Sequence, residues 1–358
     1  MLIVGIPKEI KLNEERVSII PDDVNKITKN GIQVYVQTNA GINASFTDNE
    51  YINAGAIICD TIEDIYNKAN LIIKVKEPQP YEFHLINEKH TIFTFFHFAS
   101  SSDLLKVMIN SKSTCIAYET LQDNNGKFPI LAQMSMIAGE IAVYEAIKYR
   151  FYLNINNNNN NNNNDDNNNN IKYNQEDDEI SIIGVGNAGK TAAYVAKQNK
   201  FKNINLIDKD FEKIKELEKD GFNIFEFNEL NLSKLLMKSN IVIGSIYNNG
   251  EKAKKMIIND LLVLMPKDSI FMDIAIDQGG MTEQSKPTTI TNPFIKYHNT
   301  YIYCVPNIPS IIPNKASINL SNIICPYVIS LAQEKISDEI NTGINVKNGE
   351  IIHPKLRI

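Results

Sequence analysis

The chain has 358 residues, of which 43% are hydrophobic and 22% charged, and its formal net charge at pH 7 is −6. This length favours two globular domains, and the acidic balance, with no basic cluster interleaved with aromatic residues, gives no reason to expect a nucleic-acid partner. No run approaches the roughly 18 uninterrupted apolar residues of a membrane-spanning helix, and the N-terminus MLIVGIPKEI turns polar too soon for a secretory signal, so we expect a soluble cytoplasmic protein with a small-molecule partner and no membrane association.

Short apolar strands alternate with amphipathic helices through the first 135 residues. The pattern predicts strands at residues 2–7, 32–37, 71–76 and 91–98, and helices at residues 21–31 and 61–70. This alternation is typical of an α/β domain. We expect the residues after about 306 to complete it, which gives a discontinuous domain of residues 1–135 and 306–358.

A helix is expected at residues 136–152, where apolar side chains recur every three or four positions: Ile137, Ile141, Tyr144, Ile147 and Phe151. Residues 156–170, which follow, consist only of asparagine and aspartate, and have no apolar side chains to offset the entropy of ordering them. We therefore expect a disordered surface insertion at about 154–179, near a domain boundary. A partner-binding or aggregation-prone role for the tract is the alternative.

Strands and helices alternate again after the insertion. Strands are expected at residues 180–186, 203–210, 223–227 and 240–246, with helices at 187–200, 211–221 and 229–239 between them. The sequence thus predicts an α/β protein with two Rossmann-like, doubly wound domains built on mostly parallel sheets, the second covering residues 136–305, and an active site in the cleft between the domains.

A phosphate-binding motif opens the second domain. Gly184, Gly186 and Gly189 form GxGxxG between a predicted strand and helix, and Asp208 ends the next strand. Such glycines allow a tight turn and close backbone approach to a pyrophosphate, while the acid binds the ribose hydroxyls. A carboxylate there would repel a 2′-phosphate, so the motif favours NAD over NADP.

Polar residues follow several apolar strands: His97, Asp277, Asn307, and the lysine pair Lys74 and Lys76. Ligands bind outside the carboxyl ends of strands in open α/β sheets, so these residues suggest one site. Each also has a structural interpretation: His97 as a core residue, Asp277 as a turn cap, and Lys74 rather than Lys76 as the inward-pointing lysine. The four cysteines show no metal-ligand spacing, and buried free thiols with no metal site are expected.

Together the motifs resemble the alanine dehydrogenase family, in order and at similar spacing: VGIPKEIKLNEERVSIIP, LIIKVKEP, TIFTFFHFAS, IAYETLQ, MSMIAGEIA, IGVGNAG, MDIAIDQGG and YCVPNIPSIIPNKAS. The resemblance implies reversible, NAD-dependent oxidative deamination of L-alanine to pyruvate and ammonia. It also implies a homo-oligomer, typically a hexamer. The nucleotide-binding subunit of proton-translocating transhydrogenase belongs to the same superfamily, but its pattern lacks the lysine of KVKEP and the histidine of FTFFHFA.

The resemblance assigns roles by position. It implies that Arg16 and Lys76 bind the substrate's carboxylate and carbonyl, that Met134 lines the substrate pocket, and that His97 is the acid/base, with Asp277 a second catalytic group beside the nicotinamide. Further cofactor contacts would come from Ser135, Asp208, Ile274 and Asn307. An arginine fork suits a small carboxylate, and histidine titrates near neutrality. Arg16 could instead lie on a solvated face of KLNEER.

Two segments depart from the family pattern. The asparagine tract replaces a glycine- and proline-rich hairpin at 153–180, and the segment 246–256 keeps Gly250 and Lys252 but loses two prolines. Two alternative functions therefore stay open: an NAD(H)-binding transhydrogenase-like or sensor module without turnover, and a related dehydrogenase of larger amino acids such as a saccharopine-type enzyme.

Overall fold

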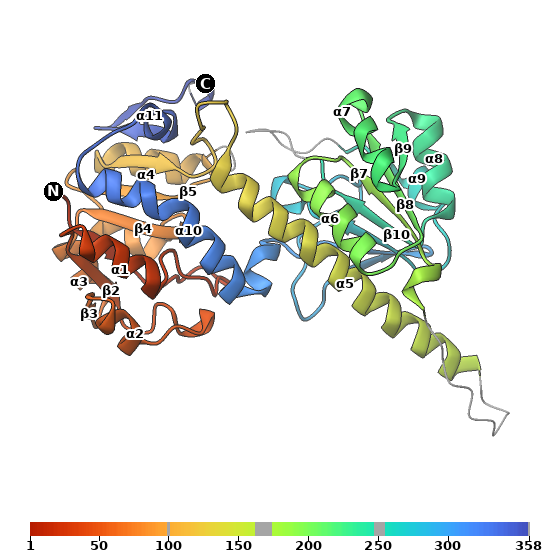
Figure 1. The fold of residues 1–358 in the computed structure, drawn as a ribbon, viewed down its shortest axis with the longest axis horizontal. Coiled ribbons are helices and arrows are strands. Elements are labelled where there is room, and N and C mark those ends of the chain that lie inside the picture. Colours follow the sequence, from red (N-terminus) through yellow and green to blue (C-terminus); the bar gives the residue numbers. More distant parts are fainter. Residues whose placement is uncertain (99–100, 162–173, 247–254, 357–358) are drawn as a thin grey trace. The chain divides into compact units, whose positions relative to one another are not determined.

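The computed structural model describes residues 1–98, 101–161, 174–246 and 255–356 (Figure 1). The chain divides into two compact units, of which the first contains Met1–Met134 and Pro309–Ile358, and the second contains Ser135–Ile308. Each unit is built on its own mostly parallel sheet with helices packed on it. The predicted α/β fold class with two Rossmann-like units is therefore confirmed.

The first unit contains an eight-stranded sheet in the order β15-β14-β6-β5-β4-β1-β2-β3. The strands from β1 to β6 pair in parallel, and β14 pairs antiparallel with both β6 and β15. Because the chain adds β2 and β3 on one side of β1 and β4 to β6 on the other, the gap between β1 and β4 is a topological switch point. The strands are β1 (Val4–Ile6), β2 (Val34–Gln37), β3 (Ile57–Cys59), β4 (Leu71–Lys76), β5 (Thr91–Phe95), β6 (Thr114–Ala117), β14 (Ile344–Lys347) and β15 (Glu350–Ile351).

Helices cover both faces of this sheet. An apolar cluster joins α3 and α4 to one face, and Tyr35 packs against it. Its neighbours Val34 and Val36 are buried on the opposite face, because side chains alternate along a strand, and α1 packs there beside α10 (Figure 1). The helices are α1 (Pro21–Lys29), α2 (Asp48–Asn53), α3 (Ile62–Lys68), α4 (Ser102–Ser111), α10 (Pro313–Ala332) and α11 (Asp338–Gly343), with 3₁₀ helices η1 (Ile42–Ala44), η2 (Pro80–Leu85) and η8 (Pro354–Leu356).

The second unit contains a seven-stranded sheet in the order β12-β13-β11-β10-β7-β8-β9, in which only β12 runs antiparallel to its neighbour. The chain adds β8 and β9 on one side of β7 and β10 and β11 on the other, so the switch point lies between β7 and β10. The strands are β7 (Glu179–Ile183), β8 (Asn203–Asp208), β9 (Asn223–Glu226), β10 (Ile241–Gly244), β11 (Ser269–Asp273), β12 (Phe294–Tyr297) and β13 (Thr300–Tyr303).

One face of the second sheet packs against α8 and α9 through a buried apolar cluster. A second contact is very close: a Cβ on Gly139 would lie 2.0 Å from the carbonyl oxygen of Ala188 in α6, so only glycine fits there. The helices are α6 (Asn187–Gln198), α7 (Phe211–Lys215), α8 (Glu229–Lys238) and α9 (Asn259–Leu262), with 3₁₀ helices η4 (Gln175–Asp177), η5 (Glu216–Asp220), η6 (Ile276–Gln278) and, at the unit boundary, η7 (Ile308–Ile311).

The helix α5 (Pro129–Asn161) is longer than the expected 136–152. It continues over the first asparagines, because adding a residue to an existing helix gains a hydrogen bond without a new nucleus. Within the expected insertion of about 154–179, residues 154–161 continue α5, and residues 174–179 form η4 and the start of β7. The remainder of the tract, residues 162–173, lies outside the described residues.

A buried ion pair joins the two flanks of this tract. Arg150 of α5 donates from Nε and Nη2 to the two carboxylate oxygens of Asp178, at 3.0 and 2.7 Å, and from Nη1 to the Asp268 carbonyl at 2.7 Å.

Among the described residues, the stretch 129–155 of α5 is the one long and apolar enough to cross a bilayer, and 44% of its most apolar window is buried. Helices inside globular domains meet the same criteria.

Candidate functional site

Three predicted site residues lie at the switch point of the first sheet. Lys76 ends β4, His97 follows β5, and Arg16 lies in the loop after β1. The charges of Lys76, Lys11 and Arg16 all act on the His97 ring. Basic groups are therefore gathered where an open α/β sheet binds its ligands.

A β-bulge in β4 separates the two lysines of KVK. Ile73 pairs with Phe93 but Lys76 pairs with Phe95, so β4 holds one residue more than β5 over this stretch. The extra residue interrupts the alternation that would place Lys74 and Lys76 on the same face of the sheet. The two side chains consequently have different partners.

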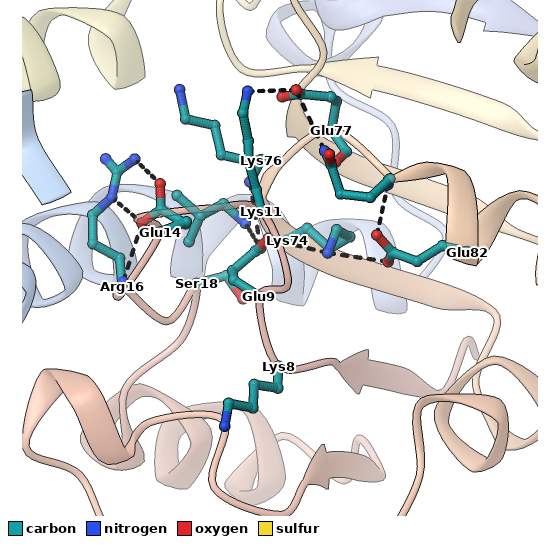
Figure 2. A network of polar contacts seen from close by, with 12 residues as sticks. Lys8, Glu9, Lys11, Glu14, Arg16, Ser18, Lys74, Lys76, Glu77 and Glu82 are labelled. Atoms are coloured by element: carbon teal, nitrogen blue, oxygen red, sulfur yellow. Dashed lines mark hydrogen bonds and ion pairs between the residues drawn. The ribbon is translucent and has the colours of Figure 1, made fainter. Parts of the chain in front are cut away.

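Lys74 is fully buried inside the first unit. Its Nζ lies 3.1 Å from Glu9 Oε2 and 3.1 Å from Glu82 Oε1 (Figure 2). The Tyr66 hydroxyl donates to Glu82 at 2.9 Å. Burial alone would lower the pKa of the ammonium, but the two carboxylates outweigh it and hold this pKa above its ordinary value. Lys74 is thus a structural charge.

The same network supports the backbone at Lys76. Glu9 Oε1 accepts hydrogen bonds from the backbone N–H of Val75 at 2.6 Å and of Lys76 at 3.3 Å. Burial raises the pKa of Glu9, and the neighbouring Lys74 opposes that rise. The buried carboxylate therefore links the interior ammonium to the strand end from which Lys76 projects.

Arg16 is 2% exposed, so it does not lie on a solvated face. Its Nε and Nη2 donate to the two carboxylate oxygens of Glu14 at 2.7 and 2.6 Å (Figure 2). Its Nη1 points to the sulfur of Met134 at 3.3 Å. The pair fixes the plane of the guanidinium. The structure thus brings Arg16 and Met134 together, as the predicted substrate pocket requires.

His97 sits at an unusual backbone position. Its φ is +51°, a left-handed conformation that few residues other than glycine adopt, and its ring stacks on Phe95 with 5.7 Å between centroids and 7° between planes. Burial, followed by the charges of Lys76, Lys11 and Arg16, lowers the pKa of the imidazole well below its ordinary value. His97 as a whole residue is half-buried. A neutral imidazole near pH 7 can accept a proton.

Four acids of this site were missed in the sequence: Glu9, Glu14, Glu77 and Glu119. Glu77 pairs with Lys11 at 2.5 Å, and Glu119 accepts the backbone N–H of His97 at 2.6 Å. A signal existed for Glu119, which stands two residues beyond the buried strand β6 in the same way that His97 follows β5. The acids near the N-terminus carry no comparable signal, because KEIKLNEER looks like a solvated charged stretch.

The glycine motif forms a tight turn at the switch point of the second sheet. Gly184 has φ +87°, and a Cβ on Gly189 would lie 1.9 Å from the Gly184 carbonyl oxygen, so both positions require glycine. Gly186 precedes the first residue of α6, and a Cβ there would meet nothing within 4 Å. The open space beside a helix N-terminus fits a pyrophosphate.

Asp208 ends β8 next to this turn. Its Oδ2 accepts the Val185 backbone N–H at 2.6 Å, and Oδ1 accepts the Asp210 N–H at 3.0 Å. The carboxylate therefore lies directly beside the glycine turn, as a ribose ligand must.

Other predicted cofactor contacts lie on the loops after β11 and β13. Asp277 of η6 accepts the backbone N–H of Asn307 at 3.1 and 3.2 Å, and Asn307 has φ +57°. Ile274 follows β11 and donates its N–H to the Gly244 carbonyl at 3.1 Å, while Ser135 lies on α5. Asp277 and Asn307 are thus brought together, whereas Ser135 comes from a different element.

The remaining expectations concern metals and thiols. No cluster of three metal-ligating side chains occurs within the described ranges. All four cysteines (Cys59, Cys115, Cys304, Cys325) are buried and free, as predicted. Gly250 and Lys252 lie outside the described residues.

Comparison with known families assigns both halves of the chain. The N-terminal domain of the alanine dehydrogenase/PNT family matches residues 5–138, and the C-terminal domain of the same family matches residues 175–354. The alanine dehydrogenase of Mycolicibacterium smegmatis is 33% identical over 336 residues, which are 93% of this chain and 88% of the relative.

Solved structures of this family have the same fold as this chain. An L-alanine dehydrogenase superposes with a TM-score of 0.89 and 28% identity, covering 99% of this chain and 98% of that one. A transhydrogenase from Sinorhizobium meliloti gives 0.82 at 20% identity, with 98% and 99% coverage, which shows the shared fold alone.

Proposed function

Because the chain belongs to the alanine dehydrogenase/PNT family, we propose that it catalyses the NAD-dependent, reversible oxidative deamination of L-alanine to pyruvate and ammonia. The observation that carries this proposal is the cluster of Arg16, Lys76 and His97 at the switch point of the first sheet. A nucleotide-binding module without a small substrate has no need of such a cluster.

Arg16 binds the substrate carboxylate. A small amino acid has little apolar surface, so charge must supply the specificity, and the guanidinium offers directional donors in a plane that Glu14 fixes. Met134, whose sulfur contacts Nη1, lines the pocket around the methyl group. Lys76 binds the oxygen that becomes the pyruvate carbonyl.

His97 moves the protons. Bound NAD would supply the acceptor for the hydride of the substrate Cα, and loss of a proton from the amino group would complete the oxidation to an imino acid. His97 then takes a proton from water as the water adds to the imino carbon, and it returns a proton to the departing nitrogen, which leaves as ammonia. Asp277 acts as a second polar group in this sequence. The reaction balances as L-alanine, NAD⁺ and water giving pyruvate, ammonium, NADH and a proton.

The second unit holds the cofactor in this proposal. Gly184, Gly186 and Gly189 cradle the pyrophosphate, and Asp208 accepts hydrogen bonds from the adenosine ribose. Further contacts come from Ser135, Ile274 and Asn307. The open space at Gly186 and the position of Asp208 support the fit of a dinucleotide. NAD rather than NADP follows from the carboxylate.

A spectrophotometric assay tests the function. Purified protein with L-alanine and NAD should produce NADH, and pyruvate with ammonium and NADH should consume it. If NADH binds but neither direction turns over, the protein is a transhydrogenase-like or sensor module. If a substrate panel gives higher kcat/KM with saccharopine-type amino acids, it is a related dehydrogenase with a larger substrate.

We also propose that the protein works in the cytoplasm as a homo-oligomer, with a hexamer as the expected size. Light scattering coupled to size exclusion measures the assembly directly.

A further inference from the structure

Glu119 binds two consecutive peptide groups at the exit of β5. Its Oε1 accepts the His97 N–H at 2.6 Å, and its Oε2 accepts the Phe96 N–H at 3.3 Å. Successive N–H groups that converge on one anion, next to a left-handed residue, form a backbone nest. The φ of His97 is +51°, so the carboxylate acts as the anion that offsets an unfavourable backbone conformation.

We propose that Glu119 is a positioning residue of this site: its ionised carboxylate holds His97 in the left-handed backbone conformation that sets the direction of the imidazole. The kinetic consequence rests on the proposed dehydrogenase function. The fork from one carboxylate to two amides does not depend on that function.

Glu119 and His97 are predicted to titrate in different pH ranges, because burial and the surrounding charges shift their pKa values in opposite directions. Lys76 from β4 acts on Glu119, while Lys76, Lys11 and Arg16 act on His97. Burial raises the pKa of Glu119 to about 7, against the opposing effects of its own backbone N–H, of the N–H groups of His97 and Phe96, and of Lys76. The pKa of His97 is lowered well below its ordinary value by burial and the same cations. Near neutral pH, therefore, Glu119 changes charge while His97 stays neutral.

This difference has a consequence for the pH profile. A protonated carboxyl keeps one good acceptor oxygen, so one of the two amides loses its partner and the His97 backbone loosens. We therefore assign the acid limb of kcat/KM for L-alanine, expected near pH 7, to Glu119 rather than to protonation of His97.

Three variants test the proposal by kinetics. Glu119→Gln keeps one acceptor but cannot ionise, and Glu119→Ala removes both. The matched control Glu50→Gln removes a carboxylate that also accepts a backbone N–H, from Thr47, but in the capping box of α2. We expect kcat to fall by a factor of about 10 to 10² in Glu119→Gln and further in Glu119→Ala, because small misplacements of a catalytic group have effects of this size. KM, NADH affinity and the control should change little. The acid limb near pH 7 should be absent from Glu119→Gln.

A stability measurement separates positioning from a merely structural role. A carboxyl whose pKa is raised on folding binds its proton better in the folded state, so ionising Glu119 costs stability as pH rises toward about 7. The Tm of Glu119→Gln relative to wild type should therefore increase from about pH 5 to about pH 7.5, although its turnover is lower. A variant that keeps wild-type turnover and the acid limb, or that loses activity only in proportion to its folded fraction, would overturn the proposal.

An NMR titration tests, without any need for turnover, whether ionisation of Glu119 affects the His97 ring. The chain has five histidines, so the His97 ring signal can be identified as the one missing from His97→Asn. This signal should shift with a midpoint near pH 7 in wild type and should not do so in Glu119→Gln. Identical titrations in both proteins would overturn the inference. A wild-type protein inactive with L-alanine would refute the proposed function and leave this test intact.

Discussion

Glu14 binds one edge of the Arg16 guanidinium bidentately, with Nε 2.7 Å from one carboxylate oxygen and Nη2 2.6 Å from the other, and both side chains are almost fully buried. A buried arginine needs such a counter-charge, because removing one partner leaves an uncompensated ion in a poorly solvated site. The pair also fixes the orientation of the fork. If Arg16 binds the substrate carboxylate as proposed, stability and substrate binding are coupled at this residue.

Glu14→Gln should lower the stability of the protein and weaken binding of L-alanine, and the two losses can be measured independently. The variant keeps the shape but loses the charge, and one amide N–H would face a guanidinium N–H. We expect a loss of about 3 kcal/mol in the free energy of unfolding, the low end for a broken buried pair. KM for L-alanine should rise about tenfold, equivalent to ~1.4 kcal/mol, with NADH affinity unchanged. Urea unfolding and steady-state kinetics measure both.

Asp103→Asn is the control for Glu14→Gln. Asp103 pairs with Lys106 at 3.4 Å on the surface of α4, where both side chains are largely exposed. Loss of this surface pair should change the free energy of unfolding by about 0.5 kcal/mol or less, and leave KM for L-alanine as in wild type. If Glu14→Gln behaved like this control, the buried pair would have neither role.

Lys74→Met tests the interior charge network. The variant leaves the carboxylates of Glu9 and Glu82 without their shared ammonium. We expect the free energy of unfolding to fall by about 3 to 5 kcal/mol near pH 8. Burial already raises the pKa of Glu9, and without Lys74 this rise must be larger. The folded variant then binds protons that the unfolded chain does not, so its stability increases as pH falls.

The loss in unfolding free energy of Lys74→Met relative to wild type should therefore be smaller near pH 5.5 than near pH 8, as measured by urea unfolding at both pH values. A deficit independent of pH would show that lost packing, rather than carboxylate repulsion, dominates. Because Glu9 also supports the backbone of Lys76, KM for L-alanine should rise in the same variant.

The sequence predicted those parts of the fold that local pattern determines. The turn at Gly184, Gly186 and Gly189 is predictable because strand, glycine spacing and helix are contiguous. The position of His97 after an apolar strand is predictable for the same reason, whereas the choice of Lys76 over Lys74 depends on the family resemblance. Elements with few apolar residues, such as α2 and the edge strand β15, were not predicted. The end of α5 was misjudged because a composition signal says nothing about how far an existing helix propagates.

Contacts between distant residues could not be predicted in the same way. Lys74 and Lys76 have the same strand parity, and only the bulge opposite Phe95 gives them different partners. Glu82 reaches Lys74 because η2 folds back over β4. The assignment of Lys74 to the interior thus depends on register and loop path, which a single sequence does not reveal.

Asp208→Ser tests cofactor choice. In the proposed function the wild-type carboxylate at the end of β8 would repel a 2′-phosphate and accept hydrogen bonds from the ribose, so wild type should prefer NAD over NADP. The serine variant should narrow the ratio of the two kcat/KM values, chiefly by weakening use of NAD. Asp210→Asn is the control: it removes a neighbouring negative charge but keeps the oxygen that caps α7, and it should leave the ratio unchanged. Equal use of both cofactors by wild type would refute the assignment.

His97→Asn tests the acid/base with the backbone kept. Asparagine tolerates the left-handed conformation better than alanine does, so this substitution removes the imidazole with little added strain at φ +51°. A positioned acid/base contributes a factor of about 10² to 10⁴, and we expect kcat for L-alanine oxidation to fall by that amount. NADH affinity, followed by fluorescence, should be unchanged, because the proposed nucleotide contacts come from other residues.

A second histidine provides the matched control for His97→Asn. His90 is buried, its Nε2 lies 2.8 Å from the Tyr66 carbonyl oxygen, and its Nδ1 accepts the Asn87 N–H at 3.1 Å, so it is a satisfied structural residue. His90→Asn should lower Tm and leave turnover per folded molecule near wild type. If His97 were also only a core residue, its variant would show this same pattern of a lower Tm with normal turnover. Opposite patterns in the two variants, a turnover defect at His97 and a stability defect at His90, would establish that the imidazole after β5 performs chemistry.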